Sequence, residues 1–113
     1  MIVQEIVDFL QAEVIAGATN ADNVISGGYV SDLLSNVMSQ AKLGNIWVTM
    51  HGHQNIVAVA SLLGLSAVII AGHIQADKEA VIKADAEEIP LISTTLSAFE
   101  VVGLLYGKGV KGV

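Results

Sequence analysis

Hydrophobic residues recur at helical spacing in the first segment of the chain and at extended spacing in the next two. The first segment predicts an amphipathic helix over residues 2–11, with its apolar positions at Ile2, Ile6, Val7 and Leu10. A short strand is expected over 13–16 and an extended segment over 24–30. The extended segment over 24–30 contains the pair Gly27-Gly28, which indicates a bulge or a backbone that another group approaches closely.

After one further helix, strand-type and helix-type segments alternate from residue 45 on. Helices are expected over 33–41, 55–63, 78–88 and 98–106. Strands are expected over 46–50, 65–71 and 89–93, and their near-continuous apolar runs are typical of strands covered on both faces. This alternation predicts right-handed crossovers, so the expected fold class is α/β, a three-layer α/β/α arrangement with a mostly parallel sheet. One compact domain over 1–113 is expected, with a glycine-rich tail over 107–113 that frays.

The composition narrows the classes of partner. Of the 113 residues, 53% are hydrophobic and only 14% are charged, which fits a fully buried sheet in a protomer that also buries surface in a homodimer. The net charge is −6, and the five basic residues are scattered lysines without any arginine, so we expect no nucleic-acid binding. An anion would have to rely on backbone N–H groups, helix N-termini or hydroxyls.

Compartment and membrane contact follow from three further features. No apolar run is long enough to span a bilayer, so no membrane partner is expected. The first residues lack the basic segment of a signal peptide, and the chain has no cysteine. A cytoplasmic location is therefore predicted, and no cofactor is indicated.

Polar residues follow each expected strand at the point where it ends. If the segments that close at Met50, Ala71 and Ser93 are parallel, their downstream loops converge at one edge of the sheet. Ligands usually bind at this edge in open α/β sheets. The residues expected there are His51, His53, Asn55, Gly72, His73, Ser93, Thr94 and Thr95, and Gly27 and Gly28 are expected to join them from the earlier strand.

The histidines allow a second hypothesis, a small metal-dependent enzyme. His51, His53 and His73 could supply three nitrogen ligands to zinc or a similar metal. The spacing is common by chance and no nearby carboxylate completes the set, so polar loop residues are the favoured interpretation. Acid–base catalysis would need Glu100 to orient a histidine, and that residue is better explained as a favourable charge near a helix N-terminus.

Hydroxyl groups over 93–97 form either an anion site or a helix cap, and capping is the simpler interpretation. The chain contains no Gly-x-x-x-x-Gly-Lys-Ser/Thr pattern, so it has no nucleotide-hydrolysing P-loop. No kinase activity is expected.

One stretch resembles a known family. Residues 24–34, Val-Ile-Ser-Gly-Gly-Tyr-Val-Ser-Asp-Leu-Leu, together with Ile46-Trp47-Val48-Thr49 and the run Ile89-Pro90-Leu91-Ile92-Ser93-Thr94, make the chain similar to a stand-alone DRTGG domain. Similar domains occur in some phosphate acetyltransferases and beside CBS domains in certain pyrophosphatases. They are also related to the N-terminal domain of HPr kinase/phosphorylase. Gly27 and Gly28 match the two glycines that end the pattern after which the family is named. Asp22-Asn23 stands where that pattern has an Asp-Arg pair, so the arginine that could contact an anion is missing here.

The resemblance implies a compact α/β module, usually regulatory or assembling, often dimeric and without a catalytic centre. By analogy with the CBS-associated members, the candidate ligand is an adenine nucleotide. It would be held by Gly27, Gly28, Thr49, His51, Asn55 and Thr94. A third hypothesis is a pure protein–protein adaptor, which would expose a large apolar patch.

Overall fold

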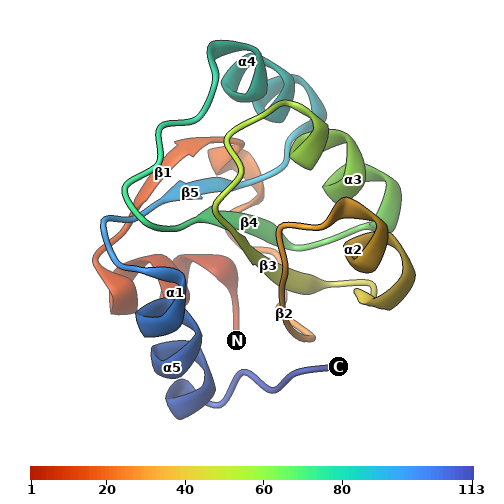
Figure 1. The fold of residues 1–113 in the computed structure, drawn as a ribbon. Coiled ribbons are helices and arrows are strands. Elements are labelled where there is room, and N and C mark those ends of the chain that lie inside the picture. Colours follow the sequence, from red (N-terminus) through yellow and green to blue (C-terminus); the bar gives the residue numbers. More distant parts are fainter.

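Figure 1 shows the computed structural model of residues 1–113, in which a five-stranded sheet lies between two layers of helices. The strands are β1 (Glu13–Ala16), β2 (Gly27–Val30), β3 (Asn45–Thr49), β4 (Ala67–Ile70) and β5 (Leu91–Ser93). The helices are α1 (Val3–Leu10), α2 (Leu34–Gln40), α3 (Asn55–Leu63), α4 (Lys78–Glu87) and α5 (Ala98–Lys108), with a 3₁₀ turn, η1 (Ala18–Asn20). None of the helices has the length and apolar character that crossing a bilayer would require.

The sheet is parallel except at one edge. The strand order is β1-β5-β4-β3-β2, and only β1 runs antiparallel to its neighbour, β5. The four parallel strands follow one another in chain order, so every crossover has the same hand and places its helix on the same face. The predicted α/β class and mostly parallel sheet are confirmed.

Two hydrophobic cores lie on opposite faces of the sheet. Along β3, Trp47 points to the core under α2, α3 and α4, whereas Ile46 and Val48 point to the core under α1 and α5. All five residues of β3 are buried, and the Trp47 indole N–H donates to the carbonyl oxygen of Ser31 at 2.9 Å. The apolar character of the strand, which carried the sequence prediction, therefore reflects helices on both sides.

Element boundaries agree with the predicted ones to within a few residues, and the helix ends have local causes. Gly64 ends α3 in the left-handed conformation, with φ of +66°. At the start of α5, the Ser97 hydroxyl oxygen accepts a hydrogen bond from the Glu100 N–H at 3.2 Å. The hydroxyl at this position thus caps the helix.

The C-terminal segment is ordered against β2, so the prediction of a frayed tail over 107–113 was wrong. Gly109, with φ of +112°, ends α5 and turns the chain back, and Val110 is buried against the α1/α5 core. The Gly28 N–H then donates to the Lys111 carbonyl oxygen at 2.8 Å, and Gly28 pairs with Gly112 in an isolated parallel bridge. The segment thereby covers part of the otherwise open edge of β2.

The Gly27-Gly28 pair is explained by this contact. A Cβ at Gly27 would lie 2.9 Å from the Lys111 carbonyl oxygen, and one at Gly28 would lie 3.2 Å from Val110 Cγ1. The close approach that the glycine pair predicted is thus made by the chain's own C-terminal segment.

Gly27→Ala should destabilise the protein by about 1–3 kcal/mol, because the new methyl group forces the C-terminal segment away from β2. Urea unfolding measures the change. Gly112→Ala is the matched control, since a Cβ there meets nothing within 4 Å. Equal stability of the two variants would show that packing of the C-terminal segment against β2 does not require glycine at position 27.

Candidate ligand-binding site at the carboxyl ends of the strands

The loops that follow β3, β4 and β5 meet at one rim of the sheet. The Asp77 N–H donates to the Gly52 carbonyl oxygen at 2.8 Å, which joins the first loop to the second. The second loop joins the third through the N–H groups of Gly72 and His73, which donate to the carbonyl oxygens of Leu96 and Thr94 at 2.7 and 3.1 Å. The predicted convergence of these loops is confirmed.

The packing of the loops leaves little room between them. A Cβ at Gly52 would lie 2.5 Å from the Gln75 carbonyl oxygen, so only glycine fits this position. The loops after β4 and β5 lead to α4 and α5 on opposite faces of the sheet, the kind of point at which a crevice usually opens in this class of fold. Here the hydrogen bonds from Gly72 and His73 join these two loops and close that point. The rim is therefore a closed surface of hydrogen-bonded loops, not a deep cleft.

Asp32 organises the β3 end of the rim. Its Oδ1 accepts hydrogen bonds from the Thr49 hydroxyl and from the Met50 N–H, both at 2.7 Å. The Thr49 hydroxyl oxygen in turn accepts from the His51 N–H at 3.1 Å. Burial raises the pKa of Asp32, but these two donors and the charge of nearby His51 lower it by more, so its pKa lies below the usual value.

Asp32 was missed as a site residue from the sequence. The available signal is its place directly after β2, because an acidic side chain there reaches the carboxyl end of the neighbouring parallel strand. A second signal is the hydroxyl of Thr49, a polar side chain in a strand buried on both faces.

The predicted site residues at this rim differ in what they leave free for a ligand. Thr49 and Thr94 are 1% and 6% exposed, and the Thr94 hydroxyl oxygen already accepts from the Leu96 N–H at 3.2 Å. His51 and Asn55 are exposed. Among the residues at this rim that were predicted to hold the nucleotide, only the imidazole of His51 and the amide of Asn55 are open to solvent.

The three histidines do not assemble a metal site. No group of three or more His, Asp or Glu side chains converges in the structure, and the chain has no cysteine. The ring nitrogen Nδ1 of His53 accepts from the Asn55 N–H at 3.1 Å, so this side chain caps α3. The next two amides of that helix, of Ile56 and Val57, donate to the carbonyl oxygens of His53 and Gln54. The backbone donors that could hold an anion at the start of α3 are thus already engaged.

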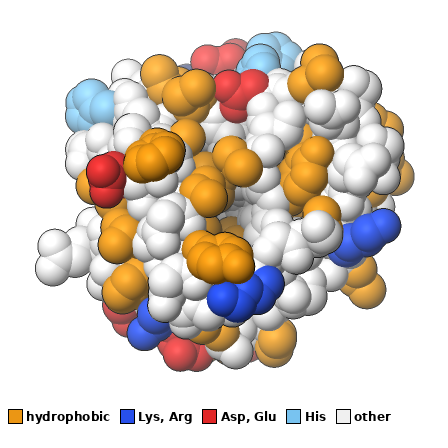
Figure 2. All heavy atoms as spheres, turned by 60° about the horizontal axis from the view of Figure 1, so that its bottom comes forward, with side chains coloured by type: hydrophobic (Ala, Val, Ile, Leu, Met, Phe, Trp, Pro, Cys, Tyr) orange, Lys and Arg blue, Asp and Glu red, His pale blue; other side chains and the backbone are white.

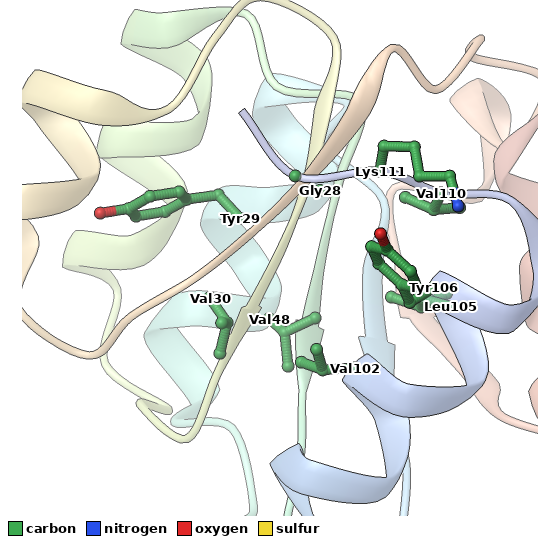
Figure 3. Close-up of a pocket in the computed structure, with 10 residues that line it drawn as sticks. Gly28, Tyr29, Val30, Val48, Val102, Leu105, Tyr106, Val110 and Lys111 are labelled. Atoms are coloured by element: carbon green, nitrogen blue, oxygen red, sulfur yellow. The ribbon is translucent and has the colours of Figure 1, made fainter.

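Gly27 and Gly28 lie apart from this rim. They pair with Asn45 and Ile46, at the opposite end of β3 from Thr49. Gly28 instead lines an apolar hollow of about 180 Å³ between β2, α5 and the C-terminal segment. In Figure 3, Val30, Val48 and Val102 point toward one another in this hollow, whereas Tyr29 points away to the other face of the sheet. The six predicted residues therefore do not form one site.

Comparison with known proteins decides the family. The family model of the DRTGG domain matches residues 5–107, which is nearly the whole chain. The chain belongs to the DRTGG domain family. Among curated proteins, none matches it in sequence.

The fold of this DRTGG domain is also seen in a solved structure. The crystal structure of the CBS and DRTGG domains of the regulatory region of Clostridium perfringens pyrophosphatase, complexed with its activator diadenosine tetraphosphate, superposes with a TM-score of 0.73 at 20% sequence identity. The match covers 91% of this chain and 45% of that one, so the chain spans about half the length of the regulatory region it resembles.

Asp32→Asn tests the role of the carboxylate at the rim. Asparagine keeps the acceptor oxygen but loses the charge, so we expect a loss of about 1 kcal/mol at pH 7, a modest value because the group is partly exposed to solvent. The wild-type pKa is lower in the folded than in the unfolded state, so the carboxylate stabilises the fold above its unfolded pKa. This contribution is lost as the pH falls through the folded-state pKa.

Urea unfolding across the pH range measures the effect. The stability gap between wild type and Asp32→Asn should be constant near neutral pH and should close in acid. Asp22→Asn is the control, because the exposed Asp22 carboxylate lacks the two hydrogen-bond donors that Asp32 has. A gap for Asp32→Asn that does not change with pH would rule out the charge as its cause.

Proposed function

We propose that this DRTGG domain is a non-catalytic regulatory module that acts as a homodimer in the cytoplasm and senses an adenine nucleotide. The observation that carries the proposal is the family match over residues 5–107, supported by the fold shared with the regulatory region of a pyrophosphatase. That region was crystallised with a dinucleotide activator, which makes adenine nucleotides the first ligands to test.

The chemistry of the carboxyl rim supports a binding role more than a catalytic one. The Asp32 carboxylate and the Thr49 and Thr94 hydroxyls form hydrogen bonds with other groups of the same chain, as expected of a rigid scaffold. The exposed His51 ring offers a flat surface for an adenine base, and the exposed Asn55 amide offers both a donor and an acceptor for its edge. With no arginine in the chain, recognition would rest on the base more than on the phosphates.

A protein–protein adaptor is the second candidate. It is favoured by the apolar hollow between β2 and α5 and by the exposed aromatic side chains beside it, Phe99 at 87% and Tyr106 at 59% exposure. Exposed apolar clusters of this kind mark interaction surfaces. An adaptor would bind a macromolecule and show no heat with nucleotides.

Isothermal titration calorimetry with AMP, ATP and diadenosine tetraphosphate tests the nucleotide role. We expect at least one of them to bind, and Asn55→Ala and His51→Ala each to weaken it about tenfold, the effect of losing roughly one hydrogen bond or stacking contact. Gln40→Ala is the matched control, because this exposed amide lies at the far end of α2. No heat with any of the three nucleotides would remove the sensing role.

Light scattering at micromolar concentration tests the assembly. We expect a mass of twice the 11.7 kDa of one chain. A mass of 11.7 kDa would refute the homodimer independently of nucleotide binding.

A further inference from the structure

The outward face of α5 is unusually apolar for a surface helix. Of its eleven residues, only Glu100 and Lys108 are charged, and they stand near the two ends. Val101 and Leu105 face the core, Phe99 and Tyr106 project from the outward side, and Leu104 is exposed at the flank of the buried stripe. Surface helices normally carry charged residues opposite their buried stripe, so the composition of α5 is that of a helix covered on both sides.

Two glycines of α5 have no explanation within the chain. Gly103 and Gly107 lie one helical turn apart, and a Cβ added at either would meet nothing within 4 Å. Glycine inside a helix is less favourable than alanine. Gly27 and Gly52, by contrast, each sit where a side chain would collide with the backbone. Small residues on one face of a helix allow another helix to approach closely.

A groove runs beside these glycines. The hollow of about 180 Å³ between β2, α5 and the C-terminal segment continues into a shallower one lined by Val30, Ala98, Phe99, Val102 and Gly103. A dry cavity of about 150 Å³ is enough to hold a benzene ring. Figure 2 shows this side of the molecule, where hydrophobic side chains surround a central depression and acidic side chains stand farther out. The same face therefore offers a projecting phenyl ring and a recess of matching size.

The charges on this face favour a second copy of the chain. Two of the chain's five lysines, Lys108 and Lys111, lie at or just beyond the C-terminal end of α5. The Lys108 ammonium nitrogen lies 4.9 Å from the centre of the Phe9 ring, and that of Lys111 lies 4.0 Å from the centre of the Tyr106 ring. The acidic Glu100 lies in the first turn of the same helix. A helix that is acidic at one end and basic at the other is complementary to itself when two copies run antiparallel.

We propose that two copies of this chain associate through α5 about a two-fold axis, with the helices antiparallel and crossing at Gly103. Phe99 of each copy enters the recess beside Tyr106 of the other, and Glu100 of each faces the lysines at the far end of the partner's helix. The contact is isologous, so each residue pair occurs twice. The proposal rests on the homodimer proposed above and specifies its surface.

Light scattering and sedimentation of the full chain test the surface with two variants. Phe99→Ser removes the projecting ring, and Gly103→Arg adds bulk at the crossing point, where a Cβ meets nothing within 4 Å in its own chain. Each should raise the dimer dissociation constant at least about thirtyfold, as expected for a central interface residue. Leu62→Ser is the matched control, because this leucine is 70% exposed on α3, on the opposite face of the sheet. It should leave the dimer unchanged.

A charge reversal tests the antiparallel arrangement. Glu100→Lys and Lys108→Glu should each weaken the dimer, because like charges then face each other across the interface. The double variant should restore the dimer, because positions 100 and 108 of the two copies again carry opposite charges. A purely structural role of either residue would not produce this rescue. Circular dichroism confirms that each variant is folded.

The outcomes separate this inference from the proposed function. A monomeric wild type would refute the homodimer and the interface together. A dimeric wild type whose mass survives Phe99→Ser or Gly103→Arg in folded protein would refute the α5 interface and leave the homodimer standing. A double charge variant that stays as weak as the single variants would refute the antiparallel pairing.

Discussion

The structure depends on the pairing of β3 between two parallel neighbours. Its five residues are buried on both faces, and Trp47 and Ile46 anchor the two cores on opposite sides of the sheet. Parallel strands require crossover helices, and because β2 to β5 follow one another in order, those helices all fall on one face. The other face is left to α1 and α5, which come from before and after the crossovers. The groove between α5 and the sheet edge exists for this reason.

Hydrogen bonds between successive loops close the rim at the carboxyl ends of the strands. A deep crevice in an α/β sheet opens where two neighbouring loops depart to opposite faces. Here the loops after β4 and β5 lead to α4 and α5 on opposite faces, but the N–H groups of Gly72 and His73 donate across from one loop to the other. The Asp77 N–H likewise ties the loop after β4 to Gly52 in the loop after β3. Asp32 adds a charged acceptor that fixes the turn after β3. The result suits a rigid module that presents a few exposed side chains.

Five glycines of the chain fall into two groups with different causes. Gly27, Gly28 and Gly52 are required because the chain's own backbone or side chains approach them closely. Gly103 and Gly107 have open space around them and weaken the helix that holds them. The first group is explained by the fold, whereas the second is in accord with the proposed contact between two copies of α5.

Sequence alone determined the elements, the α/β class and the convergence of the loops after β3, β4 and β5, because these depend on local hydrophobic period and on the handedness of crossovers. It also raised a close approach to Gly27 and Gly28 as one of two explanations of the glycine pair. Only the tertiary structure decided what does so, because the contact of Lys111 with Gly28 joins residues more than eighty positions apart. The same limit applies to Asp32, whose hydrogen bonds to Thr49 and Met50 depend on the register of β2 against β3, and to the three histidines, whose spacing in the chain says nothing of where their rings point.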